Sequence, residues 1–306
     1  MSEAKLAACV SALTAWRADP ATTAGFSSRG AAFLSEPSTL RRYAAATNGD
    51  VEKAITRLLD TIAWREESLA PPLSCLDCAV DPLSHCFHCI GYSVPTAEDP
   101  RGGALVYACA ARARTNEAAG AVRHMLHTLE HAWAAPAANG AERLLWIVDF
   151  NGFGMSHAMQ GAWPAAARGA TRHKGAPTHT HTHTPTHHAG KTSNAFLSQF
   201  QAHLPERLAL AVLVNPPWVF DMLLAVMRPF IDAKTMAKVK IIRPKEGALA
   251  EELKPLGVTD AAQLQWLSAV VALEATPGNL PPFAPLAAAA PPEARLPHAQ
   301  ALFEPT

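Results

Sequence analysis

The sequence lacks an excess of charge of either sign. Lys and Arg together number 26, Asp and Glu also number 26, and charged residues make up only 17% of the 306 residues. A nucleic-acid partner would require a basic excess to neutralise phosphates, so this balance argues against that class of partner. Any attraction to a membrane would have to come from local patches or apolar surface, because the net charge supplies none.

Long apolar runs are also missing. No stretch reaches the roughly 18 uninterrupted apolar residues of a membrane-spanning helix. The N-terminal segment MSEAKLAACVSALTAWRADP mixes charges into its short apolar runs, unlike a signal peptide. We therefore expect a cytoplasmic protein whose six cysteines are reduced.

Common catalytic motifs are absent. The sequence has no GxSxG, no HExxH and no GxGxxG after a predicted strand. Gly190-Lys191-Thr192 is similar to the end of a phosphate-binding loop, but Pro185 stands where such a loop needs its first glycine. We expect no enzymatic activity and no cofactor.

Four cysteines have the spacing of a four-thiolate zinc site: Cys75, Cys78, Cys86 and Cys89. His85 and His88 lie nearby in the sequence. The intervening loop is short, however, and the second pair falls in a predicted strand. We therefore interpret these cysteines as small buried thiols and predict no metal site, while the spacing leaves zinc as the alternative.

What the sequence does contain is apolar periodicity, with 49% hydrophobic residues. Residues 1–70 repeat apolar positions at helical spacing, and Asp50 is a candidate N-cap. After Pro71-Pro72, strands alternate with helices, which predicts an α/β fold with a mixed, largely parallel sheet. The predicted strands are CFHCIGYS, ALVYACA, RLLWIVDF, LALAVLVNPP and KVKIIRP, with a helix over 116–134. Residues 149–152 form either a site at a strand end or a simple glycine turn.

This pattern predicts a small N-terminal helical lobe over 1–72 and an α/β lobe over 73–275. Residues 161–193 form a low-complexity insertion with six of the fourteen histidines. Residues 276–306 are rich in Pro and Ala and are expected to be a loose tail.

Three collinear stretches carry a resemblance to a known family. They are TLRRYAAATNGDVEKAITRLLDTIAWREE, GGALVYACAARARTNEAAGAVRHMLHTLE and LPERLALAVLVNPPWVFDMLLAVMRPFIDAKTMAKVKII. Together they resemble the CRAL-TRIO lipid-binding family in its phosphatidylinositol-transfer branch. The resemblance implies a helical lobe followed by an α/β lobe whose sheet forms the floor of an apolar lipid pocket.

The resemblance also implies a headgroup site. Members that transfer phosphatidylinositol hold the inositol ring with a Glu, a Thr and a Lys, which correspond here to Glu206, Thr235 and Lys238. Two basic residues contact the lipid phosphate in those members, but Thr47 and Asn48 occupy the matching positions here. The alternative is that Glu206, Arg207 and Lys238 are merely solvated charges of a turn and a strand end.

The segment PPWVFDMLLAVMRPFI is apolar on almost every side. Such a helix is usually buried core, but the resemblance favours a mobile lid over the pocket. The predicted lid and pocket residues are Trp218, Phe220, Leu223, Leu224 and Met227.

The sequence thus predicts a non-enzymatic carrier that transfers or presents a phospholipid, with phosphatidylinositol as the leading ligand. Its expected contacts are the lipid and, transiently, a membrane surface, and it is expected to be a monomer. Two alternatives stay open: a carrier of another hydrophobic molecule such as a retinoid, tocopherol or sterol, and a regulatory scaffold with a vestigial pocket.

Overall fold

The computed structural model describes residues 1–36, 38–68, 75–81, 83–96, 102–115, 117–134, 142–153, 198–218, 220–221, 224 and 233–281. The chain divides into two compact units. The helical unit comprises Met1–Ser74 and Leu197–Leu208, and the α/β unit comprises Cys75–Phe196 and Ala209–Thr306. The predicted insertion at 161–193 lies outside the described residues.

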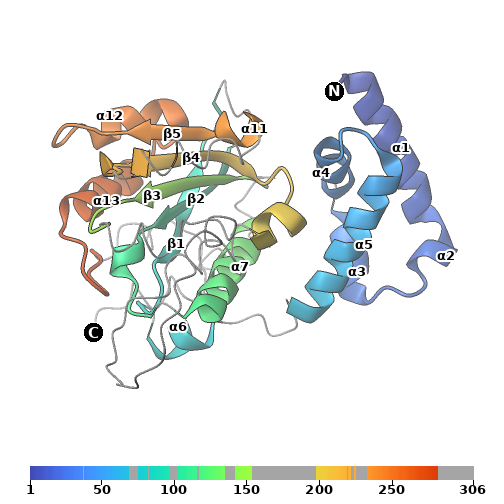
Figure 1. Ribbon diagram of the computed structural model, residues 1–306, viewed down its shortest axis with the longest axis horizontal. Coiled ribbons are helices and arrows are strands. Elements are labelled where there is room, and N and C mark those ends of the chain that lie inside the picture. Colours follow the sequence, from blue (N-terminus) through green and yellow to red (C-terminus); the bar gives the residue numbers. More distant parts are fainter. Residues whose placement is uncertain are drawn as a thin grey trace, which may run out of the picture. The chain divides into compact units, whose positions relative to one another are not determined.

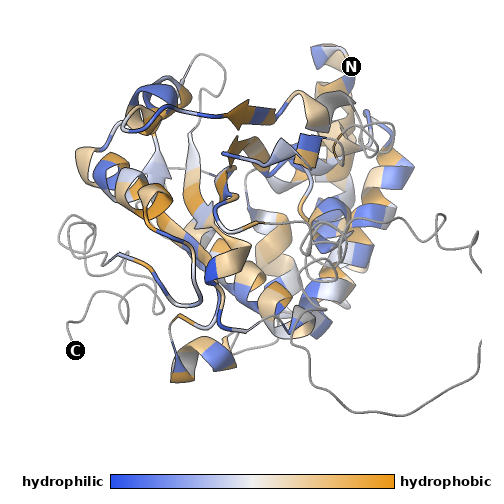
Figure 2. Ribbon diagram, turned by 60° about the vertical axis from the view of Figure 1, so that its left-hand side comes forward, coloured by the Kyte–Doolittle hydropathy of each residue, from blue (hydrophilic) through white to orange (hydrophobic). Residues whose placement is uncertain are grey.

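Helices make up the first unit (Figure 1). They are α1 (Glu3–Ala18), α2 (Pro20–Thr23), α3 (Ser28–Ser35), α4 (Thr39–Ala46) and α5 (Val51–Ser68). The backbone N–H of Lys53 donates to the Asp50 carboxylate at 3.1 Å, so Asp50 caps α5 as its sequence context predicts. Figure 2 shows hydrophobic and hydrophilic residues alternating along these helices, as expected of helices that bury one face. The buried face of α5 carries Ala54, Leu58 and Ile62, one turn apart.

The α/β unit is built on a five-stranded sheet with the order β1-β2-β3-β4-β5. The strands are β1 (Phe87–Ser93), β2 (Gly103–Ala108), β3 (Leu144–Asp149), β4 (Leu208–Val214) and β5 (Val239–Ile242). β1 runs antiparallel to β2, β2 runs parallel to β3, and β4 runs parallel to β5. The predicted α/β fold with a mixed, largely parallel sheet is confirmed, and all five predicted strands are present.

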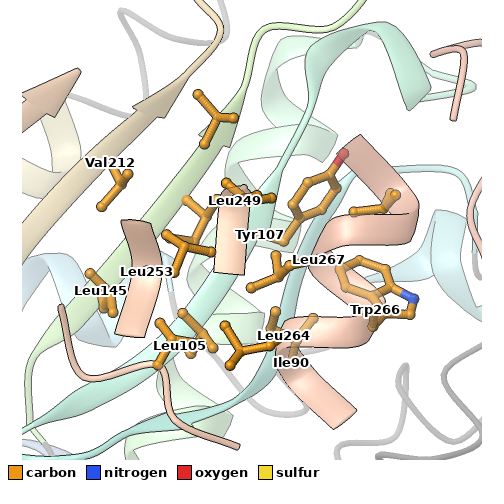
Figure 3. Close-up of a cluster of buried hydrophobic side chains, with 14 of the residues drawn as sticks. Ile90, Leu105, Tyr107, Leu145, Val212, Leu249, Leu253, Leu264, Trp266 and Leu267 are labelled. Atoms are coloured by element: carbon orange, nitrogen blue, oxygen red, sulfur yellow. The ribbon is translucent and has the colours of Figure 1, made fainter. Parts of the chain in front are cut away.

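One face of the sheet packs against the helices that follow β5 (Figure 3). These are α12 (Leu249–Leu253), the short 3-10 turn η5 (Lys254–Leu256) and α13 (Ala261–Ala272). Leu105 and Tyr107 of β2 point toward this side, and the Tyr107 and Trp266 rings meet edge to face with centroids 5.2 Å apart. Because strand residues alternate between faces, the side chains between them point to the opposite side.

Helix α7 (Ala118–Ala134) contacts β1 and β2. The Tyr92 hydroxyl of β1 donates to the Ala132 carbonyl of α7 at 2.9 Å. The Trp133 indole N–H donates to the Arg143 carbonyl at 3.3 Å, just before β3. The short helix α6 (Leu76–Val80) also packs on α7. Within the described ranges, no helix is both long and apolar enough to cross a membrane.

The C-terminal part of the described chain is bonded to the α/β unit. The Gly278 N–H donates to the Arg112 carbonyl at 2.7 Å, and the Trp266 indole N–H donates to the Pro281 carbonyl at 3.0 Å. The sequence predicted a loose tail from residue 276 onward. Residues 278–281 depart from that expectation, because these long-range bonds make them part of the packed unit.

Candidate lipid-binding site

Two of the predicted headgroup residues, Thr235 and Lys238, share one short connection. α11 (Ala233–Met236) ends just before β5, and the Lys238 N–H donates to the Thr235 carbonyl at 3.0 Å. The Lys238 carbonyl accepts from the Ala211 N–H of β4 at 2.8 Å. Both side chains are half-buried. The turn thus places Thr235 and Lys238 beside the first residues of the β4–β5 ladder.

The third predicted headgroup residue, Glu206, belongs to the helical unit. Its backbone has a φ of 58°, in the left-handed region that non-glycine residues seldom adopt. The next residue, Arg207, is buried and pairs with Glu36 at 3.2 Å. Arg42 pairs with the same carboxylate at 3.4 Å. This ion-pair cluster fixes the backbone that carries Glu206.

The segment that carries Glu206 is held to the helices of its unit at several points. The Tyr43 hydroxyl donates to the His203 carbonyl at 2.9 Å and lies 2.9 Å from the Thr61 hydroxyl. The His203 ring stacks on Trp64, with centroids 4.4 Å apart and planes 5° apart. Arg57 donates to the carbonyls of Gln201 and Ala202. Sequence order alone had placed this segment in the lipid-binding lobe, and the structure groups it with the helices.

The described part of the predicted lid begins at the carboxyl end of the sheet. Trp218, Phe220 and Leu224 are helical, while Leu223 and Met227 lie outside the described residues. The Trp218 side chain is 67% exposed. The Phe220 ring packs on Phe150, which follows β3, with centroids 4.6 Å apart.

A bidentate ion pair also holds the start of this segment. Arg243, directly after β5, donates to both Asp221 carboxylate oxygens at 2.7 and 2.8 Å, and its Nε donates to the Pro216 carbonyl at 3.3 Å. In the sequence, Asp221 is only a charge within the apolar run PPWVFDMLLAVMRPFI. Its partner lies 22 residues away, so no local pattern reveals the pair. The ion pair thus holds the start of this segment, while Trp218 stays exposed.

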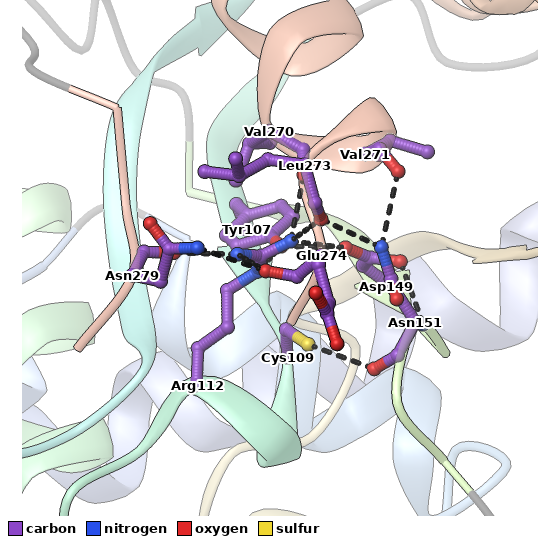
Figure 4. A network of polar contacts seen from close by, with 10 residues as sticks. All are labelled: Tyr107, Cys109, Arg112, Asp149, Asn151, Val270, Val271, Leu273, Glu274 and Asn279. Atoms are coloured by element: carbon purple, nitrogen blue, oxygen red, sulfur yellow. Dashed lines mark hydrogen bonds and ion pairs between the residues drawn. The ribbon is translucent and has the colours of Figure 1, made fainter. Parts of the chain in front are cut away.

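A buried polar network lies at the same end of the sheet (Figure 4). The Tyr107 hydroxyl donates to Asp149 at 2.6 Å, and Arg112 Nε donates to the Tyr107 oxygen at 3.1 Å. Arg112 also donates to backbone carbonyls at and beyond the end of α13, those of Val270, Leu273, Glu274 and Asn279. Burial raises the pKa of the Asp149 carboxyl, while the Tyr107 hydrogen bond opposes the rise.

The hydrogen bonds of this network join groups of the chain to one another, so its role is structural. The donors of Arg112 meet backbone carbonyls in the last turn of α13 and in the segment that follows it. Asn151, from the turn after β3, donates to the Val271 carbonyl and shares the Leu273 carbonyl with Arg112. Gly152 has a φ of 73°, and a Cβ there would lie 2.8 Å from that of Ala111. Of the two readings of residues 149–152, these contacts support the glycine turn.

One pocket lined by described residues is small. It has a volume of about 40 Å³ and lies in the α/β unit, where Leu145 and Leu210 line it from β3 and β4. Its other lining residues are Ser93, Val94, Thr96, Ala209 and Leu256. Small-molecule sites usually enclose roughly 300–1,000 Å³, so this pocket cannot contain a phospholipid. The lipid pocket stays a prediction.

Three comparisons with known proteins bear on this site. The CRAL/TRIO domain family matches residues 181–256. A stretch of 61 residues, 20% of the chain, is 39% identical to Patellin-6 of Arabidopsis thaliana and covers 14% of that protein. Over 212 residues, 67% of the chain is 26% identical to the phosphatidylinositol transfer protein PDR17 of Saccharomyces cerevisiae and covers 52% of it. The chain thus spans about half or less of these curated relatives.

A solved structure, the crystal structure of Sfh5, matches with a TM-score of 0.50. The match covers 82% of this chain and 84% of that chain at 13% identity, which shows likeness in fold. Together with the family and sequence matches, it confirms the predicted resemblance to the CRAL-TRIO family in its phosphatidylinositol-transfer branch.

Proposed function

We propose that this protein binds one lipid molecule and transfers it between membranes, or presents it at a membrane, without catalysing a reaction. The observation that carries the proposal is the likeness of 67% of the chain to a protein named as a phosphatidylinositol transfer protein. The mixed α/β fold and the family match support it. The protein would act in the cytoplasm as a monomer and touch membranes transiently.

Phosphatidylinositol is the proposed ligand, with Glu206, Thr235 and Lys238 binding the inositol ring. A buried headgroup needs donors and acceptors that replace water, since an unpaired buried polar group costs about 1–3 kcal/mol. A carboxylate, a hydroxyl and an ammonium group supply acceptors and donors for ring hydroxyls. Thr235 and Lys238 lie on one turn, which supports a shared role for these two.

Transfer assays with single variants test this assignment. Glu206→Ala and Lys238→Ala should each slow phosphatidylinositol transfer by on the order of tenfold, because a hydrogen bond to a charged group contributes roughly 1.5–3 kcal/mol. Phosphatidylcholine transfer should change little. Lys240→Ala and Glu52→Ala remove exposed charges of the same kind and serve as matched controls.

Equal loss for both lipids would show that the residues support the fold. Unchanged transfer of both would remove phosphatidylinositol as the proposed ligand.

A second candidate ligand is another hydrophobic molecule, such as a retinoid, tocopherol or sterol. The Thr47 hydroxyl lies 2.9 Å from the Tyr43 carbonyl and 3.1 Å from the Asp50 carbonyl, so it already has hydrogen-bond partners in the backbone. Asn48 adopts a φ of 55° in the same turn. Neither position offers a cation to a lipid phosphate. Mass spectrometry of lipid extracted from the purified protein separates an inositol lipid, another hydrophobe and the empty pocket of a scaffold.

We also propose that the segment of Trp218, Phe220, Leu223, Leu224 and Met227 is the lid over the lipid. An outer apolar face can enter the membrane interface, where each large side chain contributes roughly 1.5–3 kcal/mol if fully buried. Leu224→Asp should therefore slow vesicle-to-vesicle transfer while thermal melts stay normal. Leu59→Asp, on the exposed side of α5, is the control. Normal transfer by a folded Leu224→Asp protein would place the lid elsewhere.

A further inference from the structure

The first cysteine pair lies in a different environment from the second. Cys75 caps α6, with the Cys78 N–H donating to its sulfur at 3.4 Å. Both thiols are only 5% exposed. Cys86 joins the apolar cluster under α12 and α13 instead, and the Cys89 thiol lies 3.5 Å from the Gly91 carbonyl. The four cysteines are buried thiols, as predicted, and they are not brought together into the four-thiolate site that their spacing left as the alternative.

Histidines take the places that the second cysteine pair would have filled. His124 reaches the first pair from α7, and its Nδ1 lies 3.3 Å from the Cys78 sulfur. The ligand atoms of Cys75, Cys78 and His124 all lie within 4.8 Å of one another. His85, from the loop before β1, forms a second such group with Cys75 and Asp77 within the same limit.

Cys75 belongs to both groups, so its sulfur lies within 4.8 Å of a ligand atom of Cys78, of His124 and of His85. The His85 and His124 rings stack with centroids 4.8 Å apart, which keeps the two imidazoles side by side. His85 and His124 are 3% and 0% exposed. A buried cluster of this kind excludes water, which would otherwise compete for a cation.

Neighbouring groups orient both rings. His124 Nε2 lies 2.8 Å from the Phe87 carbonyl. A carbonyl only accepts, so Nε2 carries the proton and Nδ1 keeps its lone pair, which faces Cys78. His85 Nε2 lies 3.1 Å from the Asp77 carboxylate. Histidines that bind metals usually give their other nitrogen to a carbonyl or a carboxylate in this way.

We propose that Cys75, Cys78, His85 and His124 bind a single zinc ion. Two thiolates and two imidazoles are a donor set that zinc takes in structural sites, in tetrahedral geometry. On binding, each thiol gives its proton to solvent, and no electron is transferred. With four protein ligands no position stays open for substrate, so the ion stabilises the fold.

A structural ion explains how this corner of the α/β unit stays together. Helix α6 has only 5 residues, too few to be stable alone. The ligands come from α6, from the loop before β1 and from α7, so the ion would link three segments. This inference is independent of the lipid, since no proposed headgroup or lid residue takes part.

Metal analysis of the full chain tests the proposal. Protein purified without chelator should contain about one zinc ion per chain by mass spectrometry of metals. Cobalt in its place should give thiolate-to-cobalt charge-transfer absorption and the visible bands of tetrahedral Co²⁺. Cys78→Ser should lose both signals, and Asp77→Asn, which changes only the orienting carboxylate, should weaken zinc binding by roughly 10–100-fold. Cys89→Ser, a buried thiol of the second pair, is the matched control and should keep both signals.

Three results would overturn the site. Wild-type protein that stays free of zinc after zinc addition would exclude it, and this measurement holds even if a variant fails to fold. Zinc without any thiolate band would assign the metal to the His/Thr tract of 178–188. Equal loss of metal from Cys78→Ser and Cys89→Ser would show a general effect on the fold.

Discussion

The two units bury their polar side chains in different ways. In the α/β unit, Arg112 is completely buried, and its donors go to Tyr107 and to carbonyls around the end of α13. In the helical unit, the buried Tyr43 hydroxyl and the buried Arg207 guanidinium hold the segment 198–208. The Glu36 carboxylate that Arg207 and Arg42 share is 38% exposed.

The two arginines thus differ in the anion that each meets, since Asp149 is 3% exposed and the Glu36 carboxylate is partly open to solvent. A buried guanidinium cannot leave its partners without leaving a charge in an apolar surrounding, so the end of the sheet near Asp149 is fixed. Neutral hydrogen bonds and partly exposed ion pairs each contribute about 1 kcal/mol. Loss of a single contact in the segment that carries Glu206 should therefore cost less than loss of the Arg112 network.

Removing the buried cation should give the largest effect on stability. Arg112→Met leaves Asp149 buried without its cation and several carbonyls unpaired, which should lower the free energy of unfolding by about 3–5 kcal/mol. For a chain of this size that is a fall in melting temperature of roughly 10 °C. Circular dichroism melts measure it. Arg41→Met breaks an exposed pair with Glu3 and should change almost nothing. Equal melting temperatures for the two variants would make the network dispensable.

A smaller effect on stability is expected from the Tyr43 hydroxyl, which holds the segment 198–207 of the helical unit. Tyr43→Phe removes the donor to the His203 carbonyl and should cost about 1–2 kcal/mol. Because the loss is local, amide hydrogen exchange over 198–207 should rise more than exchange elsewhere.

Tyr92→Phe supplies the control for that experiment in the α/β unit. Its hydroxyl makes a bond of the same length to the Ala132 carbonyl. If this variant raised exchange over 198–207 as much as Tyr43→Phe, the contrast between the units would fail.

Local patterns predict much of this fold. The five strands, the helical lobe and the Asp50 cap were all readable, because helical spacing, apolar strand runs and capping depend on near neighbours. The collinear motifs also predicted the family resemblance that the comparisons confirm. The roles of Glu206, Thr235 and Lys238 stay predictions, since motif order names residues without showing what they bind.

Contacts between segments far apart in the sequence could not be predicted from local patterns. Tyr43 meets His203 across 160 residues, and Cys78 meets His124 across 46. The cysteine spacing suggested that Cys86 and Cys89 would join Cys75 and Cys78. Instead, Cys86 lies in the apolar cluster, and histidines from other segments approach Cys75 and Cys78. A signal existed for the buried network, since Arg112 follows an apolar strand and Asp149 ends another.

The smallest expected effect is a pH dependence that belongs to the helical unit. Burial lowers the pKa of the His203 imidazole, the nearby charge of Arg57 lowers it further, and Asp60 opposes them. The unfolded chain, with a His pKa of about 6.5, therefore binds more protons than the folded chain just below that pH. Stability from this group is complete above about pH 6.5 and falls as the pH drops toward the folded pKa, by at most about 1.4 kcal/mol per pH unit.

His203→Phe keeps a ring to stack on Trp64 and cannot titrate, so its melting temperature should fall less between about pH 7 and pH 5 than that of the wild type. His88 in the α/β unit, whose pKa burial lowers to about 3, titrates in both proteins and cancels in the difference. Parallel pH curves for the two proteins would mean that His203 is as easily protonated in the folded state as in the unfolded chain.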